Sequence, residues 1–158
     1  MIIVTGGAGC IGSAIVWALN KRGITDIILV DGVDHPEKKK NITSLNYFAL
    51  ENKDAFLDHI TNLSTPWRID AIIHMGGCSS TIERDEAFLT KTNFSYTKSL
   101  ATYALNKDIR FIYASSAATY GSGENGFSDK MDLRILNPLN LYGHSKQKFD
   151  LWAEEQGA

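Results

Sequence analysis

The chain has 158 residues, of which 44% are hydrophobic, and its 16 basic and 18 acidic side chains leave a net charge of −2. This length and apolar content are enough for one domain with one core. The charge balance argues against nucleic acid or an anionic membrane surface as a partner, and no apolar stretch approaches the roughly 18 residues that cross a bilayer. The first strand is expected to begin at Ile2, which leaves no room for a signal peptide. Cys10 and Cys78 have no partners at zinc-binding spacing, so we expect two small buried thiols in a reducing cytoplasm, with no metal site and no disulfide.

A glycine-rich turn follows the first apolar run and precedes a segment with helical patterning. Residues 2–5 are expected to form a buried strand and residues 10–22 a helix, with Gly6, Gly9 and Gly12 in and after the turn. In such a turn, backbone N–H groups and the positive end of the helix dipole face an anion such as a pyrophosphate. The first glycine allows the turn, the second the approach of the phosphates, and the third the close packing of helix on strand.

Asp31 ends a second apolar run, at residues 27–31, about 20 residues after the glycine turn. An acidic residue at this place is expected to accept hydrogen bonds from ribose hydroxyls. The two features together predict a dinucleotide-binding site, against the alternative of a glycine turn in some other α/β protein.

Strand and helix patterns alternate along the rest of the chain. Asn52 is expected to cap a helix, and Ser80 with Glu83 resembles a capping box for a long helix. Continuous apolar strands separated by helices imply an α/β fold with a doubly wound parallel sheet, covered by helices on both faces. The further expected elements are an irregular segment at 32–51 without a predicted strand, strands at 71–75 and 110–114, the long helix at 81–106, a polar loop at 121–137, and a last helix from Leu141 to the C-terminus.

Tyr142, Lys146 and Ser116 form a candidate catalytic group. Tyr142 and Lys146 are four residues apart at the start of the last expected helix, so both project from one helix face. A tyrosine is a poor base at neutral pH, but a nearby ammonium favours the phenolate. Ser116 follows a strand, at the sheet edge where open α/β folds bind ligands, and its hydroxyl is suited to hold a substrate oxygen. Taken alone, the Tyr-x-x-x-Lys spacing also arises by chance, and the serines also suit a turn.

With these motifs the whole chain resembles the extended short-chain dehydrogenase/reductase family. The resemblance implies one Rossmann dinucleotide-binding domain over residues 1–158. Because that family continues for about as long again, it also implies that the substrate-binding lobe and a second catalytic base are absent from this chain. The motifs that carry the resemblance are the glycine turn at residues 5–12, Asp31, Asn93, the Ser-Ser-Ala-Ala-Thr-Tyr-Gly segment at 115–121, and the Tyr142–Lys146 pair.

The resemblance implies a nucleotide-sugar epimerase that transiently oxidises and re-reduces its sugar with tightly held NADP, the cofactor carrying the hydride. Tyr142 would be the acid/base, Lys146 would bind the nicotinamide ribose and tune Tyr142, and Ser116 would position the sugar. The helices at 81–106 and 141–156 would form a homodimer interface. The cofactor contacts implied in this way are Gly6, Gly9, Cys10, Ile11, Gly12, Asp31, Gly32, Lys38, Lys53, Met75, Gly76, Gly77, Cys78, Ser79, Asn93, Tyr142 and Lys146.

The choice between NADP and NAD rests on charge. Asp31 alone favours NAD, because a carboxylate accepts ribose hydroxyls and repels a phosphate. Lys38 and Lys53 would offset that repulsion by pairing with the phosphate, and on this ground we favour NADP, with NAD as the alternative. The opposite interpretation is that these lysines are ordinary solvated surface charges. Gly32 and Met75 replace polar residues that the family has near the adenosine.

Two other functions remain open from the sequence. The first is a nucleotide-sugar 4,6-dehydratase, which in this superfamily carries an acidic pair just after the serine or threonine. This chain has Ala117 and Ala118 there, which argues against that activity. A non-catalytic dinucleotide-binding module is the second alternative. The Tyr142–Lys146 pair argues against it, whereas the absence of a substrate lobe argues for it.

Overall fold

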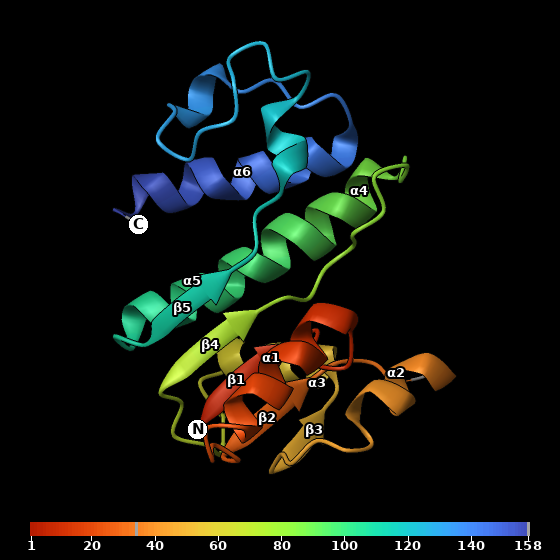
Figure 1. Cartoon of the computed structure of the whole chain (residues 1–158). Coiled ribbons are helices and arrows are strands. Elements are labelled where there is room, and N and C mark those ends of the chain that lie inside the picture. The colour runs from red at the N-terminus through yellow and green to blue at the C-terminus, as the bar shows by residue number, and fades with distance from the viewer. Residues whose placement is uncertain (34, 158) are drawn as a thin grey trace. The chain divides into compact units, whose positions relative to one another are not determined.

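The computed structural model describes residues 1–33 and 35–157. The chain forms two compact units, which we describe separately. The sheet unit comprises residues 1–76 and 99–114, and the helical unit comprises residues 77–98 and 115–157. Figure 1 shows the elements of both units along the chain.

The sheet unit is built on five parallel strands in the order β3-β2-β1-β4-β5. The central strand β1 pairs with β2 and β4, with Thr5 level with Val30 on one side and with His74 on the other. All five strands therefore end at the same edge, and the order reverses direction beside β1, where this class of sheet binds ligands. The predicted doubly wound α/β fold is confirmed. The strands are β1 (Ile2–Thr5), β2 (Ile27–Val30), β3 (Ala49–Glu51), β4 (Ala71–His74) and β5 (Arg110–Tyr113).

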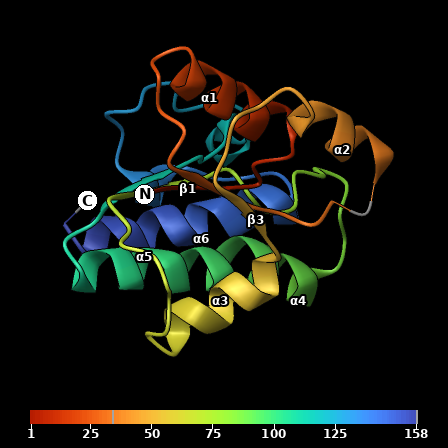
Figure 2. The same cartoon turned by 90° about the horizontal axis from the view of Figure 1, so that it is seen from below.

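Helices cover both faces of this sheet, with α1 on one side and α3 on the other (Figure 2). The core is formed by strands whose side chains are buried on both faces, as in β2, where all four residues are buried. Helix α3 is capped by the side chain of Asn52, as predicted, and buries Phe56 and Ile60. The helices of this unit are α1 (Cys10–Asn20), α2 (Pro36–Ile42), α3 (Lys53–Thr61) and the part of α5 (Tyr96–Asn106) that follows residue 98.

The helical unit is organised around α6 (Leu141–Glu155), which packs against four shorter segments. Asn140 caps this helix through a hydrogen bond from the Gly143 N–H, and Phe149 and Ala153 lie buried on it. The segments that α6 contacts are α4 (Glu86–Leu89), the π-helical η1 (Thr90–Ser95), and the 3₁₀ helices η2 (Ala117–Tyr120) and η3 (Leu133–Ile135).

The segment at 32–51 was not predicted correctly, because it contains α2 and β3. Helix α2 is short and charged, and it begins at Pro36 after His35, whose ring accepts the Glu37 N–H. Its single fully buried residue is Ile42, so it has little apolar periodicity to reveal it. Strand β3 has three residues and lies at the sheet edge. Asp34, in this segment, and Ala158, at the end of the last predicted helix, lie outside the described residues.

The predicted capping box at Ser80 is wrong. The helical segment begins at Glu86, and the Asp85 carboxylate caps it by accepting the Phe88 N–H. The Glu83 carboxylate instead accepts the N–H groups of the next two residues, Arg84 and Asp85. The predicted helix at 81–106 is thus a turn followed by α4, η1 and α5. A π-helical turn inside a helix is frequent at functional sites. None of the helices in the described ranges combines the length and hydropathy needed to cross a membrane.

Candidate functional site

The glycine turn between β1 and α1 has the geometry that binds phosphate groups in α/β folds. Gly6 has φ of +65°, and its N–H bonds to the Val30 carbonyl at 2.8 Å. A Cβ on Gly12 would lie 2.2 Å from the Gly6 oxygen, so only glycine permits this packing of helix on turn. Gly9 caps α1 without a side chain, which leaves the first N–H groups of the helix directed at the turn.

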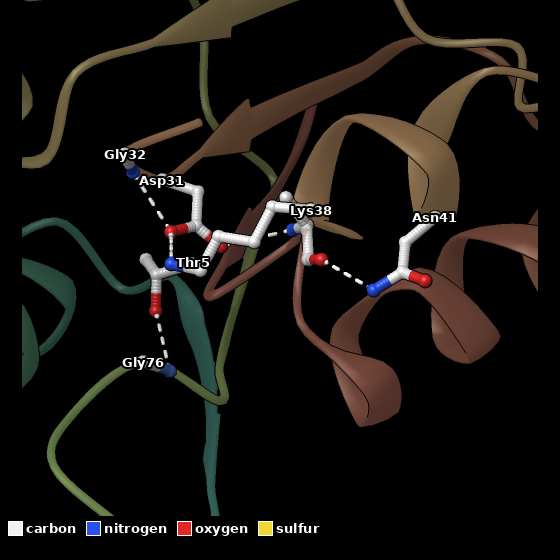
Figure 3. Close-up of polar contacts among 7 residues, drawn as sticks. Thr5, Asp31, Gly32, Lys38, Asn41 and Gly76 are labelled. Atoms are coloured by element: carbon white, nitrogen blue, oxygen red, sulfur yellow. Dashed lines mark hydrogen bonds and ion pairs between the residues drawn. The ribbon is translucent and has the colours of Figure 1, made fainter. Parts of the chain in front are cut away.

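Asp31 ties this turn to the end of β2 (Figure 3). One carboxylate oxygen accepts the Ala8 N–H at 3.0 Å, and the other accepts the Gly32 N–H at 2.8 Å and lies 2.6 Å from Lys38 Nζ. The Asp31 side chain is only 8% exposed, whereas that of Lys38 is 40% exposed. The negative charge of Asp31 is therefore neutralised by Lys38, whose ammonium group remains partly exposed to solvent.

Two further polar contacts fix the turn, and the sequence did not predict them. Asn41 of α2 donates its amide N–H to the Ala8 carbonyl at 2.9 Å, and the Gly76 N–H donates to Thr5 Oγ1 at 3.3 Å (Figure 3). Thr5 Oγ1 also lies 2.5 Å from Nδ1 of the buried His74. The loop that follows β4 is thereby held against the glycine turn, with the Gly76 backbone too close to Gly6 to admit a Cβ there.

In the helical unit, the buried Asn93 of η1 joins two segments. Its Oδ1 accepts the Cys78 N–H at 2.8 Å, and its Nδ2 donates to the Cys78 carbonyl and to Ser145 Oγ, both at 3.0 Å. Ser145 Oγ in turn donates to the Tyr142 carbonyl at 2.7 Å. Asn93 thus connects the segment at Cys78 to the turn of α6 that separates Tyr142 from Lys146.

Replacing Asn93 by alanine is expected to lower the free energy of unfolding by about 1–3 kcal/mol, because it removes the hydrogen bonds to the partly buried backbone of Cys78 and to the buried Ser145 hydroxyl. Chemical denaturation followed by circular dichroism measures this. Asn125→Ala is the matched control, since Asn125 is exposed and donates one hydrogen bond to the Ile135 carbonyl. Equal losses in the two variants would contradict a special role for Asn93.

Two of the candidate catalytic residues lie in the first turns of α6, and the third lies at the start of η2. Tyr142 is buried, Lys146 is partly buried one turn later, and Ser116 caps η2 by accepting the Ala118 N–H at 3.2 Å. Helix α6 approaches η2 closely, because a Cβ on Gly143 would lie 2.8 Å from the Ala118 carbonyl oxygen. Burial lowers the pKa of the Lys146 ammonium, and the charge of Asp150 opposes that shift. Ser116 and Tyr142 therefore lie on neighbouring segments of one unit.

The predicted site residues are divided between the units. In the sheet unit, the structure brings the glycine turn, Asp31, Gly32, Lys38 and Gly76 together, whereas Lys53 Nζ, at the start of α3, lies 3.0 Å from the Asp54 carboxylate. In the helical unit, it joins Asn93 to Cys78 and to α6. Asn41, Ser145 and Asp150 were missed from the sequence, and Thr5, Ala8 and Ser115 were quoted only within motifs, without the contacts that they make. The expected burial of both cysteines is wrong, because Cys10 at the start of α1 is exposed and Cys78 is only partly buried. In the described ranges no group of three or more His, Cys, Asp or Glu side chains is arranged to hold a metal ion.

The fold and the glycine turn belong to a known class of proteins, because residues 2–158 match the NAD dependent epimerase/dehydratase family. The chain is a member of that family. It is 50% identical over 158 residues to the ADP-L-glycero-D-manno-heptose-6-epimerase of Nitratidesulfovibrio vulgaris Hildenborough, an alignment that covers 99% of this chain and 49% of the relative. The corresponding protein of Fusobacterium nucleatum is 49% identical over 159 residues, covering 99% of this chain and 48% of the relative. The chain thus spans about half the length of the curated relatives it matches.

Solved structures share the fold. The ADP-L-glycero-D-manno-heptose-6-epimerase of Helicobacter pylori superimposes with a TM-score of 0.81 at 24% identity, over 98% of this chain and 50% of the other. The UDP-glucuronic acid 4-epimerase of Bacillus cereus, solved in complex with NAD, gives a TM-score of 0.80 at 24% identity, over 98% and 51%.

Proposed function

We propose that this chain is the cofactor-binding half of an ADP-L-glycero-D-manno-heptose 6-epimerase, an enzyme of lipopolysaccharide core synthesis that uses NADP. The observation that carries the proposal is the identity of about half of all residues to proteins of that name over the whole of this chain. The active protein would also need a segment equivalent to the half of its relatives that does not align with this chain.

The residues of the sheet unit fit a dinucleotide. The glycine turn offers N–H groups at a helix N-terminus, and a Cβ on Gly9 would meet only the Gly6 oxygen, so the space beside the turn is open to a phosphate. The Asp31 carboxylate lies at the end of β2, where a ribose is held in this class of sheet. When bound, a nicotinamide group takes a hydride from the sugar carbon and returns it to the opposite face.

The residues of the helical unit supply proton transfer and orientation. Tyr142 would remove the hydroxyl proton of the sugar during oxidation and return it during reduction. The Lys146 ammonium, one turn away, would stabilise the phenolate form and hold the nicotinamide ribose. The Ser116 hydroxyl would position the reacting sugar oxygen beside Tyr142.

Lys38 supports NADP over NAD. Its ammonium group neutralises Asp31 and remains partly exposed. The phosphate that distinguishes NADP from NAD would therefore lie beside a neutral Asp31–Lys38 pair rather than beside an unpaired carboxylate. Lys38→Met is therefore expected to weaken NADP binding about tenfold while leaving NAD binding nearly unchanged. Isothermal titration with each cofactor measures the two affinities.

Lys39→Met is the matched control, because Lys39 lies on the same helix with the same charge and is exposed. It should change neither affinity appreciably. A loss of the same size for both cofactors in Lys38→Met, or an equal loss of NADP affinity in the control, would contradict this role of Lys38.

Two helical segments of the chain also support a homodimer. Helix α6 and the helical segment from α4 to α5 correspond to the pair that forms the dimer interface in the resembling family. An aromatic and lysine cluster lies on these helices, with Lys98 over the rings of Phe94 and Trp152 and Lys148 over Phe94. Sedimentation is expected to show a dimer at tens of micromolar, where an interface of standard size persists. Only monomer at that concentration would contradict it.

The activity is tested by following the ratio of the two carbon-six epimers of the ADP-heptose. The protein extended to the length of its relatives should interconvert them. The 158-residue chain should bind cofactor without turnover, because Ser116 alone would not hold the sugar in a reactive pose. Turnover by the short chain at a normal enzymatic rate would show that the substrate site has been misplaced. Cofactor binding without turnover in the extended protein would favour a dinucleotide-binding module instead.

A further inference from the structure

Helix α6 carries a buried carboxylate that the proposed function does not use. Asp150 is 6% exposed, and its Oδ2 accepts a hydrogen bond from Ser115 Oγ at 2.5 Å. Ser115 directly precedes Ser116, which caps η2. The hydrogen bond therefore fastens the segment that carries Ser116 to the helix that carries Tyr142 and Lys146.

Asp150 also follows Lys146 by one helical turn, so the two side chains project from the same face of α6. Lys146 is partly buried, and burial alone favours the neutral amine. The negative charge of Asp150 acts in the opposite direction and favours the ammonium.

The other charges near α6 are engaged elsewhere. Arg134 of η3 pairs with Asp132 and with Glu154, and Tyr120 of η2 donates to Asp129. Among the described residues, the charge that bears on the pKa of Lys146 is that of Asp150. The remaining titratable groups on α6 and on the elements packed against it are Glu86 of α4, Lys91 of η1, and Tyr142, His144, Lys148 and Glu155 of α6.

We propose that Asp150 is a positioning residue of the site, which acts through two neighbours. Through Ser115 it fixes the serine segment against α6, and through its charge it keeps Lys146 in the ammonium form. The inference rests on the proposed function, because a charged Lys146 serves the Tyr142 proton transfer suggested there. Asp150 itself touches neither sugar nor cofactor in this account.

Carbon-13 NMR of the lysine Cε atoms tests this without any assay of activity. The Lys146 resonance is assigned by its disappearance in Lys146→Arg, and its titration is compared between the native chain and Asp150→Asn. The midpoint should fall in Asp150→Asn, so that at a fixed pH below the midpoint the unprotonated fraction of Lys146 rises about threefold to tenfold. An unchanged midpoint in a folded Asp150→Asn protein would overturn the proposal.

Three variants separate charge from packing. Asp150→Glu retains the charge and should keep the midpoint near that of the native chain. Ser115→Ala removes the hydrogen bond alone, so it should lower the melting temperature and leave the midpoint in place. Glu155→Gln makes the same charge change as Asp150→Asn at an exposed position of α6 and should have no effect. A shift in Ser115→Ala or Glu155→Gln as large as that in Asp150→Asn would also overturn the proposal.

A measurement on the native chain covers the case in which Asp150→Asn does not fold. The Lys146 Cε resonance should then show a second, smaller step at the same pH as the titration of the Asp150 carboxyl carbon. Absence of this step would overturn the proposal. Calorimetric titration of the same samples with NADP and NAD tests the proposed function separately, since failure of binding leaves the Lys146 result standing.

Discussion

Replacing Tyr142 by phenylalanine in the extended protein is expected to lower the rate of epimerisation by about 10²–10⁴-fold, the usual contribution of a general acid–base group. The substitution removes only a hydroxyl, and the buried ring keeps its place at the start of α6. Affinity for NADP should therefore remain nearly unchanged. The rate is measured from the epimer ratio over time, and the affinity by calorimetry.

Tyr47→Phe provides the matched control, because Tyr47 packs against the core of the sheet unit and has no role in the proposed chemistry. Its epimerisation rate should equal that of the native protein. Full activity in Tyr142→Phe would remove Tyr142 from the mechanism. Loss of activity together with loss of cofactor affinity would point to a structural role for its hydroxyl.

Placing valine at Gly9 is expected to abolish the heat of NADP and NAD binding. Gly9 has φ of −76°, which any residue adopts, and an added Cβ would lie 3.2 Å from the Gly6 oxygen, so the turn must shift by only a few tenths of an ångström. The added side chain would occupy the space beside the turn where a pyrophosphate is expected. Loss of the glycine cap, together with this contact, is expected to cost about 1–2 kcal/mol of unfolding free energy, and the protein should remain folded.

Gly12→Ala is the contrasting variant. A Cβ at Gly12 meets backbone at 2.2 Å, so this smaller substitution should cost at least about 1–3 kcal/mol of unfolding free energy. The account predicts loss of binding with a retained fold in Gly9→Val and loss of stability in Gly12→Ala. Normal cofactor affinity in Gly9→Val would show that the phosphates do not lie at this turn.

The elements that could be predicted from the sequence are those with a clear local pattern, such as an apolar run or a glycine turn. Strands β1, β2 and β4 are buried apolar runs, and the glycine turn marks the start of α1. Strand β3 was missed because three residues at a sheet edge are too few to show an alternation of apolar and polar side chains. The helix start at Glu86 was misplaced because Ser80 and Asp85 are both good cap residues, and the sequence does not choose between them.

The candidate site was predicted in its residue types more than in its contacts. The Asp31 position follows from its distance to the glycine turn, but its contact with Lys38 depends on α2, which was not predicted. The bonds of Asn93 to Ser145 and of Ser115 to Asp150 join segments far apart in the sequence. Such contacts are fixed by tertiary packing, for which short motifs carry no signal. The site residues and their roles stay predictions until the variants are measured.

The source of the hydrogen at carbon six of the product tests the central claim most directly. Transient oxidation and re-reduction returns the hydrogen that was removed, whereas epimerisation by proton removal and replacement takes a new one from water. The extended protein should therefore interconvert the two ADP-heptose epimers in deuterium oxide without incorporating deuterium at carbon six, as read by mass spectrometry and NMR. Deuterium at that carbon in the product would contradict the account.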